Sequence, residues 1–290
     1  MAGTKSFLTA AAFSALICVS YGQSVVHDVI YDKEGGAAFT MDVFKPAKPT
    51  GQAVICLVSG GWISTHDAIN PMLAGAFTAK GFTVFEVVHG SQPKYVIPEI
   101  VKQLQRAVRF IRFNAATYGI QPNEIGVTGA SSGGHLSMML AGMGAPGDPN
   151  AKDPVDKTGS ELNAVVDFFG PTDFLNWGDT SKQPINDPKL AIFMPAFGLK
   201  PEWTKPQTDA YAKDLSPIYK VTANYPPILI IHGDKDPLVP IQQSNLLDAV
   251  LETNHVKHKL LVIPGGAHDA KTYLGGLPTA IEWFALNLKG

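Results

Sequence analysis

The stretch that decides the fold is Glu124-Ile125-Gly126-Val127-Thr128-Gly129-Ala130-Ser131-Ser132-Gly133. An apolar run of strand length, residues 124–128, leads into a G-x-S-x-G pattern, and a helical stretch begins near Ser132. Small residues are needed in such a pattern because the chain turns sharply from strand to helix, and larger side chains would collide with neighbouring elements. A serine held at this turn presents its hydroxyl above the edge of the sheet. We therefore predict that Ser131 is a nucleophile.

Apolar runs of strand length recur along the chain, with amphipathic helical stretches between them. This alternation is typical of parallel strands joined by crossover helices. The predicted strands cover residues 25–31, 39–44, 53–58, 83–88, 124–128, 164–168, 227–231 and 259–263. The first two alternate apolar with polar residues, so we expect an antiparallel hairpin at the sheet edge. The sequence thus predicts an α/β protein with a mostly parallel central sheet of about eight strands, flanked by helices.

Between the strands, one long helix and two long loops are predicted. Apolar residues recur at helical spacing over residues 98–118. The arginines of this helix are interpreted as a solvated face: Arg106, Arg109 and Arg112. Residues 144–160 and 175–207 are expected to be loops, and the second is a candidate cap or lid over an active site. A solvated insertion is the alternative for that segment.

The composition favours one enzyme domain. A chain of 290 residues, 45% hydrophobic and 17% charged, can bury one large core. The 23 basic and 25 acidic side chains give a net charge of -2 without a basic patch, so we expect no nucleic-acid partner. The sequence has two cysteines, Cys18 and Cys56, and no zinc-like Cys/His constellation, so we expect no metal.

Residues 1–22 have the features of a signal peptide. A basic start precedes an apolar stretch from Phe7 to Val19, and the small residues after it fit cleavage between Gly22 and Gln23. The apolar run is shorter than the roughly 20 residues that a membrane span needs, although an uncleaved anchor is the alternative. We therefore expect a secreted or periplasmic protein with no membrane span after cleavage, and one catalytic domain over residues 23–290.

A serine hydroxyl at neutral pH is a poor nucleophile, so Ser131 needs a base and the base needs an orienting acid. His232 and His268 each follow a late predicted strand, at the sheet edge where sites in open α/β sheets form. We predict that His268 is the base. Asp234 and Asp236 follow the other late strand, and from position alone either one can orient the histidine.

Two stretches of this chain resemble the α/β-hydrolase superfamily, and the second resembles its hormone-sensitive-lipase-like and carbohydrate esterases. Residues 233–240 match the pattern G-x-x-D-x-x-V-P, which implies Asp236 as the acid and Asp234 as a turn residue. Residues 58–62, Val-Ser-Gly-Gly-Trp, resemble the loop H-G-G-G-W, which implies Gly60 and Gly61 as oxyanion donors beside Ser132. The usual histidine of that loop is absent, which leaves open how the loop is held.

Further motifs resemble the bifunctional feruloyl and acetylxylan esterase-like branch, over nearly all of the mature chain. They are Pro98-Glu99-Ile100, the run from Arg106 to Arg112, Gly170-Pro171-Thr172-Asp173 and Ser216-Pro217-Ile218. Where relatives often carry Tyr-Arg-Leu-Ala-Pro, this chain has Val88 to Pro93, a region that lines the pocket in the family. We therefore treat His89 and Trp62 as candidate substrate-binding residues, with core packing as the alternative for Trp62.

The resemblance implies a serine esterase that acts on small acyl esters, such as acetyl or feruloyl groups on polysaccharide. It implies an acyl-enzyme on Ser131, released by water that His268 activates, and no cofactor. The alternatives are a formamidase, amidase or peptidase of the same fold, and a non-catalytic binding protein on a hydrolase scaffold. The sequence leaves the oligomeric state open.

Overall fold

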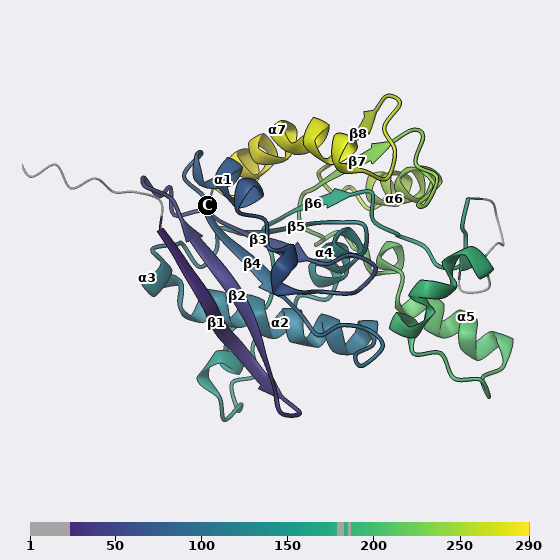
Figure 1. Ribbon diagram of the computed structural model, residues 1–290, viewed down its shortest axis with the longest axis horizontal. Helices are drawn as coiled ribbons and strands as arrows, with labels where there is room; N and C mark the ends of the chain where they lie inside the picture. The colour runs from purple at the N-terminus through teal and green to yellow at the C-terminus, as the bar shows by residue number, and fades with distance from the viewer. Residues whose placement is uncertain (1–23, 179–182, 185–186, 290) are drawn as a thin grey trace, which may run out of the picture.

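A computed structural model describes residues 24–178, 183–184 and 187–289, and within them the chain forms one eight-stranded sheet (Figure 1). The strands are β1 (Ser24–Glu34), β2 (Ala37–Lys45), β3 (Ala53–Val58), β4 (Thr83–Val88), β5 (Ile125–Ala130), β6 (Ala164–Phe168), β7 (Ile228–Gly233) and β8 (His258–Ile263). Their order in the sheet is β1-β2-β4-β3-β5-β6-β7-β8. β1 and β2 form an antiparallel hairpin at one edge, β2 also pairs antiparallel with β4, and β3 to β8 pair in parallel. The mostly parallel sheet and edge hairpin predicted from the sequence are confirmed.

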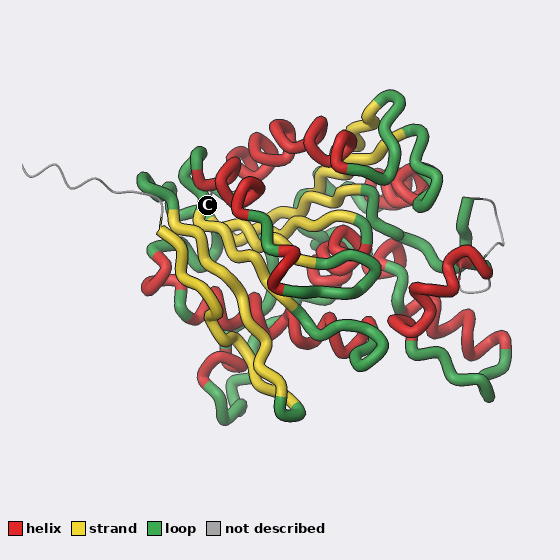
Figure 2. The backbone as a smooth tube through the Cα atoms, viewed as in Figure 1, coloured by secondary structure: helices red, strands yellow, loops and turns green. Residues whose placement is uncertain are grey.

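Helices cover both faces of the sheet (Figure 2). They are α1 (Pro71–Thr78), α2 (Ile97–Phe113), α3 (Ala115–Tyr118), α4 (Ser132–Gly142), α5 (Lys205–Asp214), α6 (Gln242–Thr253) and α7 (Ala270–Asn287), with short 3₁₀ helices η1 (His66–Ala68), η2 (Pro154–Lys157), η4 (Pro188–Phe197) and η5 (Pro217–Lys220). Apolar residues of α2, α4 and α6 pack into the core on one face. Residues of α1 and α7 pack into the core on the other face.

Strand β3 shows why the central strands are continuous apolar runs. All six of its residues are buried, because helices cover both faces of the sheet. Its side chains alternate, so that Ile55 and Leu57 join one core while Val54 and Cys56 join the other. Cys56 is a free thiol, and its burial raises the pKa of the thiol well above the usual value. We infer that this cysteine is a core residue.

The long helix predicted over residues 98–118 is two helices in the structure. α2 ends at Phe113, and α3 begins after Asn114, whose backbone leaves the helical conformation. Ile100, Leu104 and Ile111 are fully buried on one side of α2, as the helical spacing predicts.

The interpretation of the α2 arginines as a solvated face is wrong. Arg106 donates to the carboxylates of Asp153 and Asp156, at 2.6 and 2.8 Å. Arg109 and Arg112 donate to backbone carbonyl oxygens of residues 158, 159 and 161. The three guanidinium groups therefore attach the polar segment around residues 144–161 to the helix. The bonded residues are 47 to 50 positions apart, so no local pattern in the sequence indicates these bonds.

The segment 175–207, predicted as a loop, contains η4 and leads into α5. Thr204 and Gln207 form a capping box at the start of α5. The rings of Phe193 and Phe197 in η4 pack edge-on against Trp62, with centroid distances of 6.2 and 5.4 Å. The segment thus reaches the loop after β3, and Figure 1 shows α5 at the end of the molecule away from the β1–β2 hairpin.

Residues 1–22, the predicted signal peptide, lie outside the described part of the chain. Among the helices that are described, none has the length and apolar character needed to cross a membrane.

Candidate active site

Ser131 sits on the turn between β5 and α4, as the G-x-S-x-G pattern predicts. Its φ is +58°, a backbone conformation that non-glycine residues rarely adopt and that clusters at functional sites. Its N–H donates to the carbonyl oxygen of Phe168 at 2.9 Å, which ties the turn to β6. A Cβ at Gly129 would lie 2.4 Å from the carbonyl carbon of Gly133. The turn therefore requires glycine at position 129.

A buried carboxylate orients His268. The Nδ1 atom of His268 lies 2.7 Å from Oδ2 of Asp236, whose side chain is fully buried. The other carboxylate oxygen accepts hydrogen bonds from the N–H groups of Leu238 and Val239, at 2.8 and 2.9 Å. Burial raises the pKa of Asp236, but hydrogen bonds from His232 and His268 and the nearby backbone N–H outweigh it and hold the pKa below its usual value. An ionised Asp236 favours the proton on Nδ1, which leaves Nε2 of His268 free to accept one.

The loops that carry the acid and the histidine are packed directly against each other. A Cβ at Gly233 would lie 2.3 Å from the carbonyl carbon of Gly266, so glycine is needed at the contact. The Oδ1 atom of Asp234 accepts a hydrogen bond from the N–H of Gly265 at 2.7 Å. Asp234 therefore joins the two loops, and the structure places Asp236 against the histidine.

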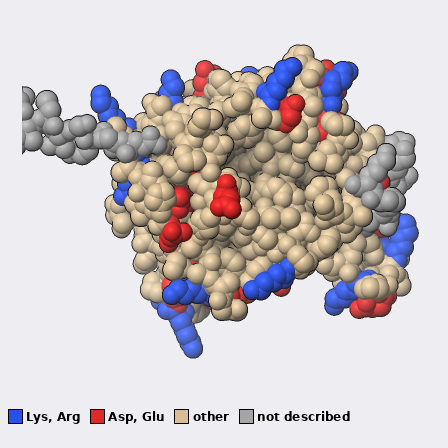
Figure 3. Space-filling model, viewed as in Figure 1, with Lys and Arg blue, Asp and Glu red and all other residues tan. Residues whose placement is uncertain are grey.

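Ser131 and His268 line the same cavity, which has a volume of about 450 Å³. Phe169, Phe193 and Tyr273 contribute to its walls, and the ring of Phe169 lies 4.6 Å from that of His268. Figure 3 shows the surface hollowed beneath α7 on this side of the molecule. Among the hydrogen bonds of the described residues none joins Ser131 to His268, and the two residues are brought together as lining residues of this cavity.

The assignment of Gly60 as an oxyanion donor is corrected by the structure. Its N–H donates to the carbonyl oxygen of Ile63 at 2.9 Å, and the N–H of Ile63 donates back to Gly60 at 3.0 Å. Ser132 is the first residue of α4, where N–H groups have no partner within the helix. Gly61 and Ser132 both lie beside Ser131 in a second pocket. The arrangement leaves Gly61 and Ser132 as the candidate donor pair.

The loop after β3 is held by side chains other than the histidine that relatives carry. The hydroxyl of Ser64 donates to the carbonyl oxygen of Val58. The side-chain amide of Gln92 donates to the carbonyl oxygen of Gly61 at 2.6 Å. The backbone N–H of Gln92 donates to the carbonyl oxygen of Trp62 at 3.1 Å. Gln92 thus holds two consecutive peptide groups of the loop through the carbonyl oxygens of Gly61 and Trp62.

His135 also holds this loop, a role that the sequence analysis missed. The indole N–H of Trp62 donates to Nδ1 of His135 at 3.2 Å, and Nε2 of His135 lies 2.8 Å from the carbonyl oxygen of Leu215. Burial lowers the pKa of His135 to about 4, so the ring is neutral at pH 7, with its proton on Nε2. A histidine among the small and apolar residues of the helix after the nucleophile is the signal that could have indicated this role.

Trp62 lines the second pocket, a small apolar slot that Ser131 also lines. The free volume of this slot is about 30 Å³. Besides Ser131, Ser132 and Gly61, its lining is apolar and includes Trp62, Phe174, Phe193, Phe197, Leu238 and Val239. The prediction that Trp62 contacts the substrate is consistent with this position.

The structure does not bring His89 to either cavity, so its assignment to substrate binding is corrected. The ring is buried, and Nδ1 lies 2.7 Å from the carbonyl oxygen of Gly90. Burial lowers the pKa of His89 to about 4. The N–H of Gly90 donates to the side chain of Gln103 at 2.9 Å, which draws this segment against α2 instead of the nucleophile.

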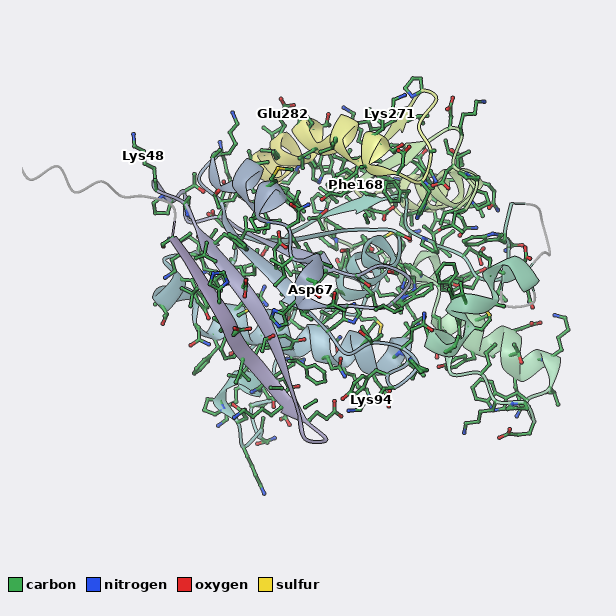
Figure 4. The ribbon with its side chains drawn as sticks, viewed as in Figure 1. Lys48, Asp67, Lys94, Phe168, Lys271 and Glu282 are labelled. Atoms are coloured by element: carbon green, nitrogen blue, oxygen red, sulfur yellow. The ribbon has the colours of Figure 1, made fainter. Side chains whose placement is uncertain are left out.

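One group of side chains has donor types suited to a metal. Asp28, Asp42 and His66 bring one ligand atom each to within 4.8 Å of one another. They come from the β1–β2 hairpin and η1, and Figure 4 labels the neighbouring Asp67. The carboxylate of Asp42 already accepts hydrogen bonds from His27 and from the N–H of Asp28. This group belongs to the hairpin edge and not to the cavity of Ser131.

The chain is similar to a family and to single proteins that are named as esterases. The family model BD-FAE matches residues 41–251. Esterase LipC of Mycobacterium tuberculosis is 27% identical over 226 residues, which cover 77% of this chain and 54% of LipC. The chain spans about half the length of the curated relatives it matches.

Solved structures show the same fold. A truncated form of a carbohydrate esterase from gut microbiota is 26% identical, with a TM-score of 0.76 over 93% of this chain and 98% of that one. An acetyl ester-xyloside bifunctional hydrolase from Caldicellulosiruptor lactoaceticus is 21% identical, with a TM-score of 0.72 over 91% of this chain and 97% of that one. The α/β-hydrolase fold predicted from the sequence is confirmed.

Proposed function

Because the chain belongs to the BD-FAE family, we propose that it is a serine esterase that hydrolyses small acyl esters through an acyl-enzyme. The observation that supports this most directly is the buried Asp236–His268 hydrogen bond at the wall of the cavity that Ser131 also lines. A hydroxyl, an oriented imidazole and an ionised carboxylate are the groups that acyl transfer requires.

In the proposed reaction, Oγ of Ser131 bonds to the ester carbonyl carbon while Nε2 of His268 takes the hydroxyl proton. The carbonyl oxygen becomes an oxyanion and accepts hydrogen bonds from the N–H groups of Gly61 and Ser132. The bond to the alcohol oxygen then breaks, and His268 gives its proton to that oxygen. Water repeats the sequence on the acyl-enzyme, which releases a carboxylic acid and restores Ser131.

We further propose that the acyl groups are carried by carbohydrate, as acetyl or feruloyl substituents. The carbohydrate esterase from gut microbiota supports this choice of substrate class. Secretion, or export to the periplasm, through residues 1–22 suits a polymeric substrate that does not enter the cell. The reaction needs no cofactor in this scheme.

The test compares the wild-type protein with Ser131→Ala on p-nitrophenyl acetate, acetylated xylan and N-formylkynurenine. We expect ester turnover by the wild type, a loss of at least about a thousandfold in the variant, and fluorophosphonate labelling of Ser131 alone. If the wild type turns over N-formylkynurenine but neither ester, the proposed activity would be formamidase instead of esterase. Ester turnover that survives in Ser131→Ala would refute the nucleophile, and a folded wild type without turnover or labelling would indicate a binding protein.

A further inference from the structure

The two cavities beside Ser131 differ in access to His268. The large cavity is lined by both Ser131 and His268, whereas the lining of the apolar slot includes Ser131, Gly61 and Ser132 but not His268. In the proposed reaction the leaving alcohol takes its proton from His268, so the alcohol has to lie in the large cavity. The acyl group, bound between Ser131 and the oxyanion donors, then extends into the slot.

The sizes of the two cavities agree with this division. A single water needs about 10–15 Å³ of such space, so the slot, with about 30 Å³, has room for two or three atoms of that size. The large cavity has about 450 Å³. It continues toward α1 and α7 into a further hollow of about 310 Å³ that shares Ser59, Gly60, Ala130 and Tyr273 with it. The space for the alcohol is large, and the space for the acyl chain is small.

Gly61, Ser131, Leu238 and one aromatic residue, Phe193, line both cavities. Phe193 of η4 is part of the wall of the slot and of the large cavity. Its ring lies over the loop after β3 that carries Gly61, here called the oxyanion loop, since a Cβ at Gly61 would be 2.8 Å from Cε1 of Phe193. The ring also packs edge-on against Trp62. A longer acyl chain leaving the slot would therefore meet this ring.

We propose that Phe193 is a specificity-determining residue that restricts the acyl group to about the size of acetyl and excludes aromatic acyl groups such as feruloyl. This inference rests on the proposed esterase function and chooses between its two acyl classes. It also gives the segment 175–207 a role in substrate selection, through one side chain of η4.

The experiment measures kcat/KM for p-nitrophenyl acetate, butyrate and octanoate, and for methyl ferulate. The nitrophenyl series keeps the alcohol constant, so that differences report the acyl side alone. The variants are Phe193→Ala and Phe193→Leu, and the matched control is Ile192→Ala, because Ile192 is the preceding residue and is 73% exposed. Thermal unfolding of each variant checks that it is folded.

We expect the wild type to prefer acetate to butyrate by about tenfold or more, the range that a few methylene groups produce in a confined pocket. Phe193→Ala should raise the butyrate-to-acetate ratio at least about tenfold, Phe193→Leu should raise it less, and Ile192→Ala should leave it unchanged. The inference is overturned if the wild type accepts octanoate or methyl ferulate as well as acetate, or if both folded Phe193 variants keep the wild-type ratio. Either result, with activity that still depends on Ser131, leaves the proposed esterase function standing. Absence of all Ser131-dependent turnover overturns the function itself.

Discussion

Replacement of Asp236 by asparagine should abolish most activity while it preserves the shape of the site. The side-chain oxygen of the introduced asparagine can still accept the N–H groups of Leu238 and Val239, which now bind Oδ1 of the aspartate. Its NH₂ group then faces Nδ1 of His268, which lies 2.7 Å from the present Oδ2. Two N–H groups cannot bond to each other, so the imidazole has to move its proton to Nε2. That atom can then no longer take the proton of Ser131.

The expected loss follows from this change of tautomer. A serine hydrolase whose base carries its proton on the wrong nitrogen loses about four orders of magnitude in kcat, which corresponds to about 5.5 kcal/mol in the activation free energy. Initial rates with p-nitrophenyl acetate at pH 7 to 8 measure it.

The matched control is Asp234→Asn in the same loop. Its side-chain oxygen can still accept the N–H of Gly265, so we expect less than about a threefold change in kcat/KM. If Asp236→Asn keeps more than about a tenth of wild-type activity, or if the two variants lose activity equally, the assignment of the acid is wrong.

Three further outcomes are expected. Ser131→Ala should lose at least about a thousandfold in kcat while its circular dichroism spectrum is unchanged, and a collapsed spectrum would show a structural role instead. Gly129→Ala should cost about 3 kcal/mol or more in urea unfolding, because its Cβ collides with the backbone of Gly133, and an unchanged midpoint would contradict the tight turn. Burial raises the pKa of Asp167 to about 7, although His232 and a backbone N–H act to lower it. Because the pKa in the unfolded chain is about 4, the neutral carboxyl favours the folded state at low pH, and this contribution to stability is lost as pH rises from about 4 to about 7. Asp167→Asn should therefore gain stability relative to the wild type between pH 5 and pH 8, and a difference in unfolding free energy that does not change with pH would rule this out.

The central elements were predictable because their signals are local. The apolar runs at residues 53–58, 83–88 and 164–168 correspond to β3, β4 and β6 with the same bounds, since strands buried on both faces need apolar residues throughout. The turn at Ser131 was predictable for the same reason, as Gly129 is required by its contact with Gly133, four residues along the chain.

The oxyanion loop could be predicted only in part. Its glycine pair marks the loop, but which N–H is free depends on the hydrogen bonds between Gly60 and Ile63, which no residue type reveals. The contact of Trp62 with His135 joins residues 73 positions apart, so the histidine in α4 indicates a polar role but not the residue that it contacts. His89 followed the expected strand, yet its ring turned into the interior toward Gly90.

The buried thiol of Cys56 makes the chain convenient for site-specific labelling. A protein that begins at Ser24 contains this cysteine alone, and its side chain is nearly inaccessible and its pKa is raised. A single new cysteine at the exposed position 192 should then take a maleimide fluorophore or a nitroxide without removal of the native one. Such a reporter on η4 would record, in real time, how this helix responds when an acyl group occupies the neighbouring slot.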